Sequence, residues 1–172
     1  MTRMHRLGIV LAAFSIFATQ AIAVPSATAH DFKVGELAIK HPFSRATPKG
    51  AKTGAAYMTI VNVGMSADRL ISAKTEISER AEIHRTTTEN DIMKMRIQPG
   101  GIAISSAGGE LKLQPGSEYH IMLVNLREPL QEGMRVPLVL VFEKAGTVTV
   151  ELAVEALRKR TDAQSDHGAH GN

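Results

Sequence analysis

The stretch that decides the fold is "EYHIMLVNL", residues 118–126, in which aliphatic side chains alternate with other types. In a β-strand, residues two positions apart point to the same face. Ile121 and Leu123 are therefore expected to face a core, while His120 and Met122 share the opposite face. The stretch predicts a strand that is anchored by aliphatic side chains and presents a histidine and a methionine together.

Similar runs rich in Val, Ile, Leu and Thr recur along the chain, separated by turn segments such as "TPKG", "QPGG" and "QPGS". They cover residues 32–40, 55–63, 80–87, 91–97, 109–113, 119–126, 135–143 and 147–157. Short strands at this spacing, without a long helical period, are typical of an all-β protein. We therefore predict a single domain folded as an antiparallel β-sandwich or Greek-key barrel.

The N-terminus has the layout of a secretory signal. Arg3 and Arg6 precede a twelve-residue apolar run, and "ATA" ends the segment just before His30. Such a layout is typical of a cleaved signal peptide, and the apolar run is shorter than the roughly 20 residues that span a bilayer. We predict that residues 1–29 are removed and that the folded domain occupies residues 30–157.

The composition narrows the possible functions. Loss of residues 1–29 removes two of the 20 Lys and Arg and none of the 17 Asp and Glu, so the net charge falls from +3 to +1 (18 minus 17). A near-neutral domain gives no basis for nucleic-acid binding, which needs a clustered basic surface. No other stretch is apolar enough to cross a membrane, so we expect a soluble protein outside the cytoplasm. The polar residues 158–172 predict a disordered tail.

The chain has no cysteine, which excludes disulfides and any thiolate metal site. His84, the pair Met93 and Met95, and the pair His120 and Met122 place imidazole and thioether groups on three predicted strands. These neutral, soft donors suit Cu(I), whereas Ca²⁺ and Mg²⁺ prefer carboxylates and Zn²⁺ prefers His, Cys or carboxylate. Each residue alone has a structural explanation, since methionine commonly fills gaps in a core. A Cu(I) site and a structural role both remain open at this point.

Spacing and flanking sequence carry a family resemblance. His84 is followed by ten residues and Met95, and His120-Ile121-Met122 comes later, within stretches such as "HDFKVGELAIKHPFSRAT", "AEIHRTTTENDIMKM" and "LKLQPG". Over residues 31–156 the chain resembles the PCuAC-type periplasmic copper chaperones, whose pattern is His, ten residues, Met, about twenty-one residues and His-x-Met. In this chain twenty-four residues, 96–119, separate Met95 from His120 instead of about twenty-one. Loops can absorb such an increase at small entropic cost.

The resemblance implies a cupredoxin-like β-sandwich that binds Cu(I) through His84, Met95, His120 and Met122. Met93 would be a substitute ligand or a neighbour of the site. By the same resemblance, the protein would be a non-enzymatic periplasmic metallochaperone. It would deliver copper to the copper-bearing subunit of cytochrome c oxidase during assembly, together with a thiol-bearing assembly protein.

The remaining histidines have alternative explanations. His167 and His170, near Asp166, could capture Cu(II), because imidazole and carboxylate are harder donors than thioether. They are equally explained as incidental residues of a solvated tail. His30 could chelate copper through its amine and ring or simply begin the first strand, and His41, before Pro42, is expected in a turn.

Other functional classes find less support. We find no Gly-x-Ser-x-Gly elbow, no P-loop, no His-Glu-x-x-His and no cysteine nucleophile. The alternatives to a copper chaperone are a β-sandwich module that binds a protein partner, and a periplasmic copper storage or resistance protein. A copper oxidase or monooxygenase is conceivable from His and Met ligands, but it would need an open coordination position and a substrate pocket that the sequence does not reveal.

Overall fold

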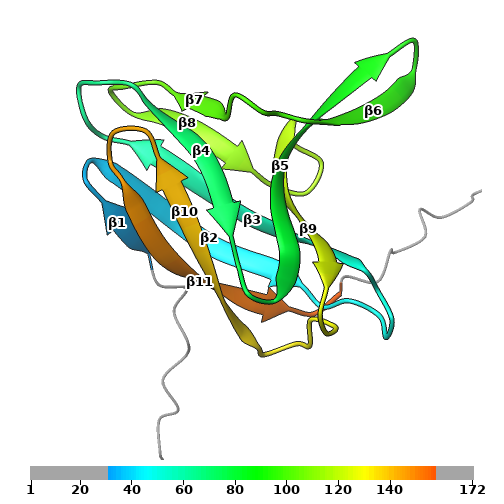
Figure 1. Cartoon of the computed structure of the whole chain (residues 1–172). Coiled ribbons are helices and arrows are strands. Elements are labelled where there is room, and N and C mark those ends of the chain that lie inside the picture. Colours follow the sequence, from blue (N-terminus) through cyan, green and yellow to red (C-terminus); the bar gives the residue numbers. More distant parts are fainter. Residues whose placement is uncertain (1–30, 158–172) are drawn as a thin grey trace, which may run out of the picture.

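The computed structural model describes residues 31–157, and in this range every regular element is a β-strand (Figure 1). The strands are β1 Phe32–Val34, β2 Leu37–Arg45, β3 Thr53–Asn62, β4 Asp68–Lys74, β5 Ser78–Glu89, β6 Ile92–Ile97, β7 Ile102–Ile104, β8 Gly109–Leu113, β9 Tyr119–Leu126, β10 Arg135–Phe142 and β11 Thr147–Glu155. The prediction of a single all-β domain of the sandwich or barrel type is confirmed.

The strands form one continuous hydrogen-bonded sheet that folds back on itself. Its order is β6-β5-β9-β8-β3-β2-β11-β10-β4-β7, with β1 added beside β2. β9 also pairs with β3, and Ala73 of β4 pairs with Ala81 of β5, which joins distant parts of this order. Most pairings are antiparallel, but β11 with β2 and β8 with β9 are parallel. This arrangement encloses one core and places β5, β9 and β6 next to each other.

The core consists of aliphatic side chains from nearly every strand. The largest fully buried side chains are Leu37, Ile39, Met58, Ile60, Leu70, Ile104, Leu113, Ile121, Leu123, Leu130, Leu138 and Leu140. Burial of each such side chain stabilises the fold by roughly 1.5–3 kcal/mol relative to exposure. The single cluster that they form accounts for the stability of a domain without disulfides.

Strand β9 follows the predicted alternation. Ile121 and Leu123 are fully buried, whereas His120 and Met122 are only partly covered. Because β9 lies between β5 and β3, its core face is held from both sides. The outer face of β9 is therefore presented in a defined register.

Two strands, β4 and β7, are absent from the sequence-based prediction. The sequence of β4, "DRLISAK", contains few β-branched residues, but Leu70 and Ala73 are buried against the core. β7 has only three residues and pairs with β4 alone. Both become strands because neighbouring strands satisfy their backbone groups, which local propensity does not reveal.

The N-terminal strand region also differs from the prediction. The run 32–40 is divided at Gly35, which has a φ of 52°, and the second strand continues to Arg45. His41 was expected in a turn, but it lies within β2, where the register with β3 shifts between Lys40 and Phe43. Its φ of 47° fits this irregularity, and its Nε2 lies 2.8 Å from Glu155 Oε1.

Asp68 joins the start of β4 to the turn between β10 and β11. The carboxylate accepts hydrogen bonds from the backbone N–H groups of Arg69 (2.7 Å), Lys144 (2.9 Å) and Ala145 (2.9 Å). Burial by itself would raise the pKa of Asp68, but these donors and the Lys144 charge outweigh it, so the pKa lies below its usual value. The folded state therefore favours the ionised carboxylate.

Asp68→Asn is expected to lower the free energy of unfolding at pH 7 by about 1–3 kcal/mol, because the amide group presents N–H donors to backbone donors. The stabilisation from Asp68 is complete above the carboxyl's unfolded pKa of about 4 and is lost as the pH falls through the lower folded pKa. Urea unfolding at pH 7 and at about pH 3 should show a smaller difference between the two proteins at the lower pH. An equal difference at both pH values would contradict this account.

Candidate metal site

His84 and His120 form the centre of the candidate site. They are directly opposite each other in the antiparallel pair of β5 and β9, and their ring centroids are 5.7 Å apart. Both side chains lie on the face opposite the core, since Ile83 and Ile121, which also pair, are buried. Sheet register therefore brings together two imidazoles that are far apart in the sequence.

Met122 and Met95 lie on the same face, on opposite sides of His84. Met122 is opposite Glu82 on β5, and Met95 of β6 is opposite Thr86 on β5. Each methionine is therefore a diagonal neighbour of His84, a relation in which Cα atoms are roughly 7–8 Å apart and long side chains can meet. The structure thus places all four predicted ligands on one face of three adjacent strands.

The β5–β6 hairpin projects from the body of the sheet as an arm (Figure 1). Its outer strand carries the exposed apolar side chains Ile92, Met93, Met95 and Ile97. Met95 is 49% exposed, while Met93, one step further out and opposite Thr88, is 75% exposed. Met95 is therefore the methionine of the arm that is closer in register to His84.

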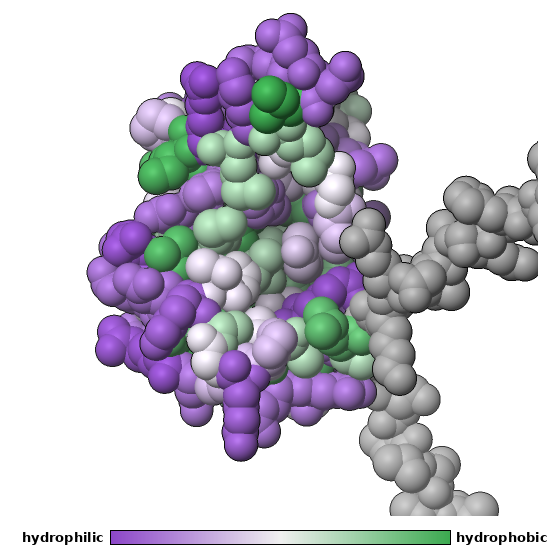
Figure 2. All heavy atoms as spheres, turned by 90° about the vertical axis from the view of Figure 1, so that its right-hand side faces the viewer, coloured by the Kyte–Doolittle hydropathy of each residue, from purple (hydrophilic) through white to green (hydrophobic). Residues whose placement is uncertain are grey.

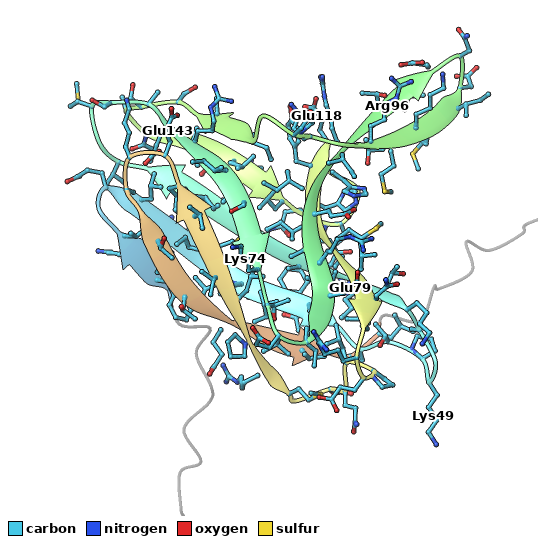
Figure 3. All side chains as sticks on the ribbon, viewed as in Figure 1. Lys49, Lys74, Glu79, Arg96, Glu118 and Glu143 are labelled. Atoms are coloured by element: carbon cyan, nitrogen blue, oxygen red, sulfur yellow. The ribbon has the colours of Figure 1, made fainter. Side chains whose placement is uncertain are left out.

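Figure 2 shows the side of the molecule from which this arm projects. Neutral and apolar residues form a central band there, with hydrophilic residues on either side. Figure 3 places Arg96 on the arm and Glu118 at its base. Glu118 binds Arg85 of β5 at 2.6 Å, so a charged pair lies beside the base of the arm.

The electrostatics of the site favour a neutral imidazole at His120. Burial and, to a lesser extent, the charge of His84 lower the pKa of His120 below its usual value. For Glu82 the charged form is favoured. Its hydrogen bonds to Arg80 and, to a lesser extent, to His84 outweigh the effect of burial and lower the pKa of its carboxyl. At neutral pH the site therefore offers an unprotonated His120 and an ionised Glu82, which contacts His84.

One nitrogen of His84 has no hydrogen-bond partner among residues 31–157. Its Nε2 lies 2.9 Å from Glu82 Oε2, but its Nδ1 is buried and makes no hydrogen bond within this part of the chain. Buried polar atoms without partners are rare, and an ion is one of the groups that explain them. The unpartnered nitrogen thus fits a metal-ligating histidine.

The donor types of the site also restrict the metal. Within residues 31–157, no group of three or more His, Cys, Asp or Glu side chains is arranged to hold a metal ion. The donors that the sheet register brings together on this face are two imidazoles and the thioethers of Met122 and Met95. This donor set suits Cu(I) rather than a hard cation.

The segment between Met95 and His120, which is longer than in the family pattern, contains β7, β8 and a tight turn. The Ser117 hydroxyl closes this turn through the N–H of Gln114 (2.9 Å) and the carbonyl of Tyr119 (2.8 Å). Gly116 has a φ of 82°, a conformation that glycine adopts readily. The approach to His120 is thus an ordered turn at the end of β8.

Of the other histidines considered from the sequence, only His41 is among the residues that the structure describes. His41 binds Glu155, and His30, His167 and His170 lie outside the residues that the structure describes. Sequence reasoning did not identify Glu82, whose carboxylate contacts His84. Its position two residues before a candidate ligand is a signal that could have identified it.

Comparison with known proteins identifies the family. A family model described as "Putative lipoprotein LpqE-like" matches residues 37–154, which is most of the chain. The chain belongs to the LpqE-like family. This LpqE-like chain is also 32% identical over 114 residues to "Putative lipoprotein Lxx21020" of Leifsonia xyli subsp. xyli, covering 65% of the chain and 68% of that relative. Among residues 31–157, no helix is long and apolar enough to cross a membrane.

Solved structures extend the comparison to PCuAC domains. The LpqE-like chain is similar to "Copper-bound PCuAC domain from PmoF2", with a TM-score of 0.63 and 30% identity over 74% of this chain and 99% of that domain. It is also similar to CuI-DR1885 from Deinococcus radiodurans, with a TM-score of 0.55 and 27% identity over 75% of this chain and 83% of that protein. The predicted resemblance to PCuAC-type copper chaperones is confirmed.

Proposed function

We propose that the protein is a periplasmic metallochaperone that holds Cu(I) through His84, Met95, His120 and Met122. The observation that carries this proposal is the sheet register, which pairs His84 with His120 and sets a methionine diagonally on each side of His84. Two imidazoles and two thioethers form a complete soft donor set for a monovalent copper ion.

The similarity to solved structures supports the proposal. The PmoF2 domain is described as copper-bound, and DR1885 was studied in a Cu(I) form. The unpartnered Nδ1 of His84 and the lowered pKa of His120 add independent support, because a histidine ligand must be unprotonated at the coordinating nitrogen. None of these residues is arranged as a nucleophile and base, so we propose a carrier and not an enzyme.

The exposure of the site suits transfer. Met95 is half exposed on a projecting hairpin, whereas His84 is nearly buried, so an incoming ligand from an acceptor would reach the Met95 side first. Because all four ligands are neutral, each can be exchanged without separating opposite charges. We propose that copper leaves by stepwise replacement that begins at Met95.

The proposed acceptor is the copper-bearing subunit of cytochrome c oxidase, with a thiol-bearing assembly protein as the second partner. We further propose that residues 1–29 direct export and are removed, and that His167 and His170 of the 158–172 tail bind Cu(II). Mixing the copper-loaded protein with the metal-free copper domain of the oxidase subunit and following that domain's absorption spectrum tests delivery. Retention of copper by the donor would favour storage instead.

Anaerobic Cu(I) titration against a competing chelator tests the binding site. We expect one equivalent to bind tightly, with both sulfur and nitrogen neighbours in the X-ray absorption spectrum. Met95→Leu should weaken binding by at least about tenfold, because it removes one thioether but keeps the volume of the side chain.

Met93→Leu is the matched control for this variant, since Met93 is on the same face of the same strand and one step further from His84. Its Cu(I) affinity should equal that of the unmodified protein. Equal losses in the two variants would assign both methionines to the site, and a loss confined to Met93→Leu would exchange their roles. Binding through nitrogen and oxygen alone would exclude the proposed donor set.

A further inference from the structure

Glu82 links the candidate ligand His84 to Arg80. Its Oε2 lies 2.9 Å from His84 Nε2, and its Oε1 accepts a hydrogen bond from Arg80 Nε at 2.8 Å. Both oxygens of the carboxylate are thus engaged by neighbours on β5. The side chain is 20% exposed, so this arrangement is partly shielded from water.

The contact with Glu82 selects one tautomer of His84. A carboxylate oxygen accepts a hydrogen bond, so the proton of the neutral imidazole belongs on Nε2. Nδ1 then carries the lone pair, and this is the nitrogen that is buried without a partner. In metal sites, a carboxylate that holds one ring nitrogen in this way orients the other toward the metal.

Sheet register also places Glu82 opposite a second candidate ligand. Its Cα partner on β9 is Met122, so the carboxylate lies on the face that carries the candidate ligands. The carboxylate is shared between Arg80 and His84, so Glu82 can hold the His84 ring without replacing a soft donor.

We propose that Glu82 is the positioning residue of the copper site: by accepting the Nε2 proton of His84, it makes Nδ1 the nitrogen that binds Cu(I). This inference rests on the proposed function, because it assumes that His84 is a ligand. Glu82 itself does not bind the ion. It acts through the ring orientation and tautomer of His84.

Long-range ¹H–¹⁵N correlation of the imidazoles in the copper-free protein tests the tautomer without any metal. In the unmodified protein we expect His84, when neutral, to carry its proton on Nε2. Glu82→Leu, which removes the acceptor, should populate both tautomers and weaken Cu(I) binding by about 10–100-fold. Glu82→Gln retains an acceptor oxygen, so it should restore the tautomer and recover part of the affinity.

Glu79→Leu is the matched control. Glu79 also binds Arg80, at 2.8 Å, but its other carboxylate oxygen is held by Asn125 and not by a histidine. This variant should leave the His84 tautomer and the Cu(I) affinity unchanged. Thermal unfolding of all variants separates loss of the fold from loss of the ring orientation.

The copper-loaded protein completes the test. A shift on Cu(I) binding that is centred on His84 Nδ1, with Nε2 still protonated, is the expected result. A proton on Nδ1 in the copper-free protein, coordination through Nε2, or an unchanged tautomer in Glu82→Leu would each overturn the proposal. Absence of Cu(I) binding to the unmodified protein would overturn the proposed function instead, and the tautomer in the copper-free protein would still decide the role of Glu82.

Discussion

Replacing both β9 ligands, with His120→Ala and Met122→Leu in one chain, is expected to reduce Cu(I) affinity by at least about 100-fold. Loss of a single residue that supports a ligand already costs about 10–100-fold, and here two ligands are lost. The fold should remain, because both side chains lie on the outer face and are only partly buried. Chelator competition measures the affinity, and urea unfolding measures the stability.

Each single variant should show part of this effect. Met122→Leu keeps the side-chain volume, so the free energy of unfolding should change by less than about 1.5 kcal/mol while Cu(I) binding weakens. Val124→Ala is a control on the same face of β9, and its Cu(I) affinity should be unchanged. If Met122→Leu binds Cu(I) as tightly as the unmodified protein, Met122 is not a ligand.

Leu123→Ala should have the opposite consequence. Leu123 is fully buried, although its sequence neighbours Met122 and Val124 are only partly buried. Truncation of Leu123 leaves a cavity in the core. We expect the free energy of unfolding to fall by about 2–5 kcal/mol. At temperatures well below the unfolding transition, Cu(I) affinity should be retained because His120 and Met122 stay on the outer face.

Urea unfolding and Cu(I) titration of Leu123→Ala at the same temperature check this separation. Together with Met122→Leu, the variant compares two adjacent residues that alternate between core and site. A large loss of copper affinity in the folded Leu123→Ala protein would show that the core side of β9 controls the geometry of the ligands. A stability loss below about 1 kcal/mol would show that the cavity collapses.

Local sequence predicted many of the strands well. The bounds of β8 and β9 are those expected from "GELKL" and "YHIMLVNL", because both segments combine strong alternation with turn residues on each side. The same reasoning missed β4 and β7. β4 has few β-branched residues and β7 is only three residues long, so neither gives a clear local pattern, and both are strands through pairing with β10 and with each other.

The sequence by itself determined the all-β class, the absence of thiolate ligands and the alternation that puts His120 and Met122 on one side of a strand. These features depend only on composition and on the two-residue period of a strand. The motif spacing also indicated that His84 and Met95 belong with them. It contained no information on which strands are neighbours.

Only the tertiary structure decided the register that pairs His84 with His120, the unpartnered state of His84 Nδ1 and its contact with Glu82. Residues 85–119 separate the two histidines in the chain, and β5 meets β9 because both bury their aliphatic faces in the common core. A shift of one residue would turn one histidine to the opposite face. The site therefore depends on packing of the whole domain, which a local pattern cannot specify.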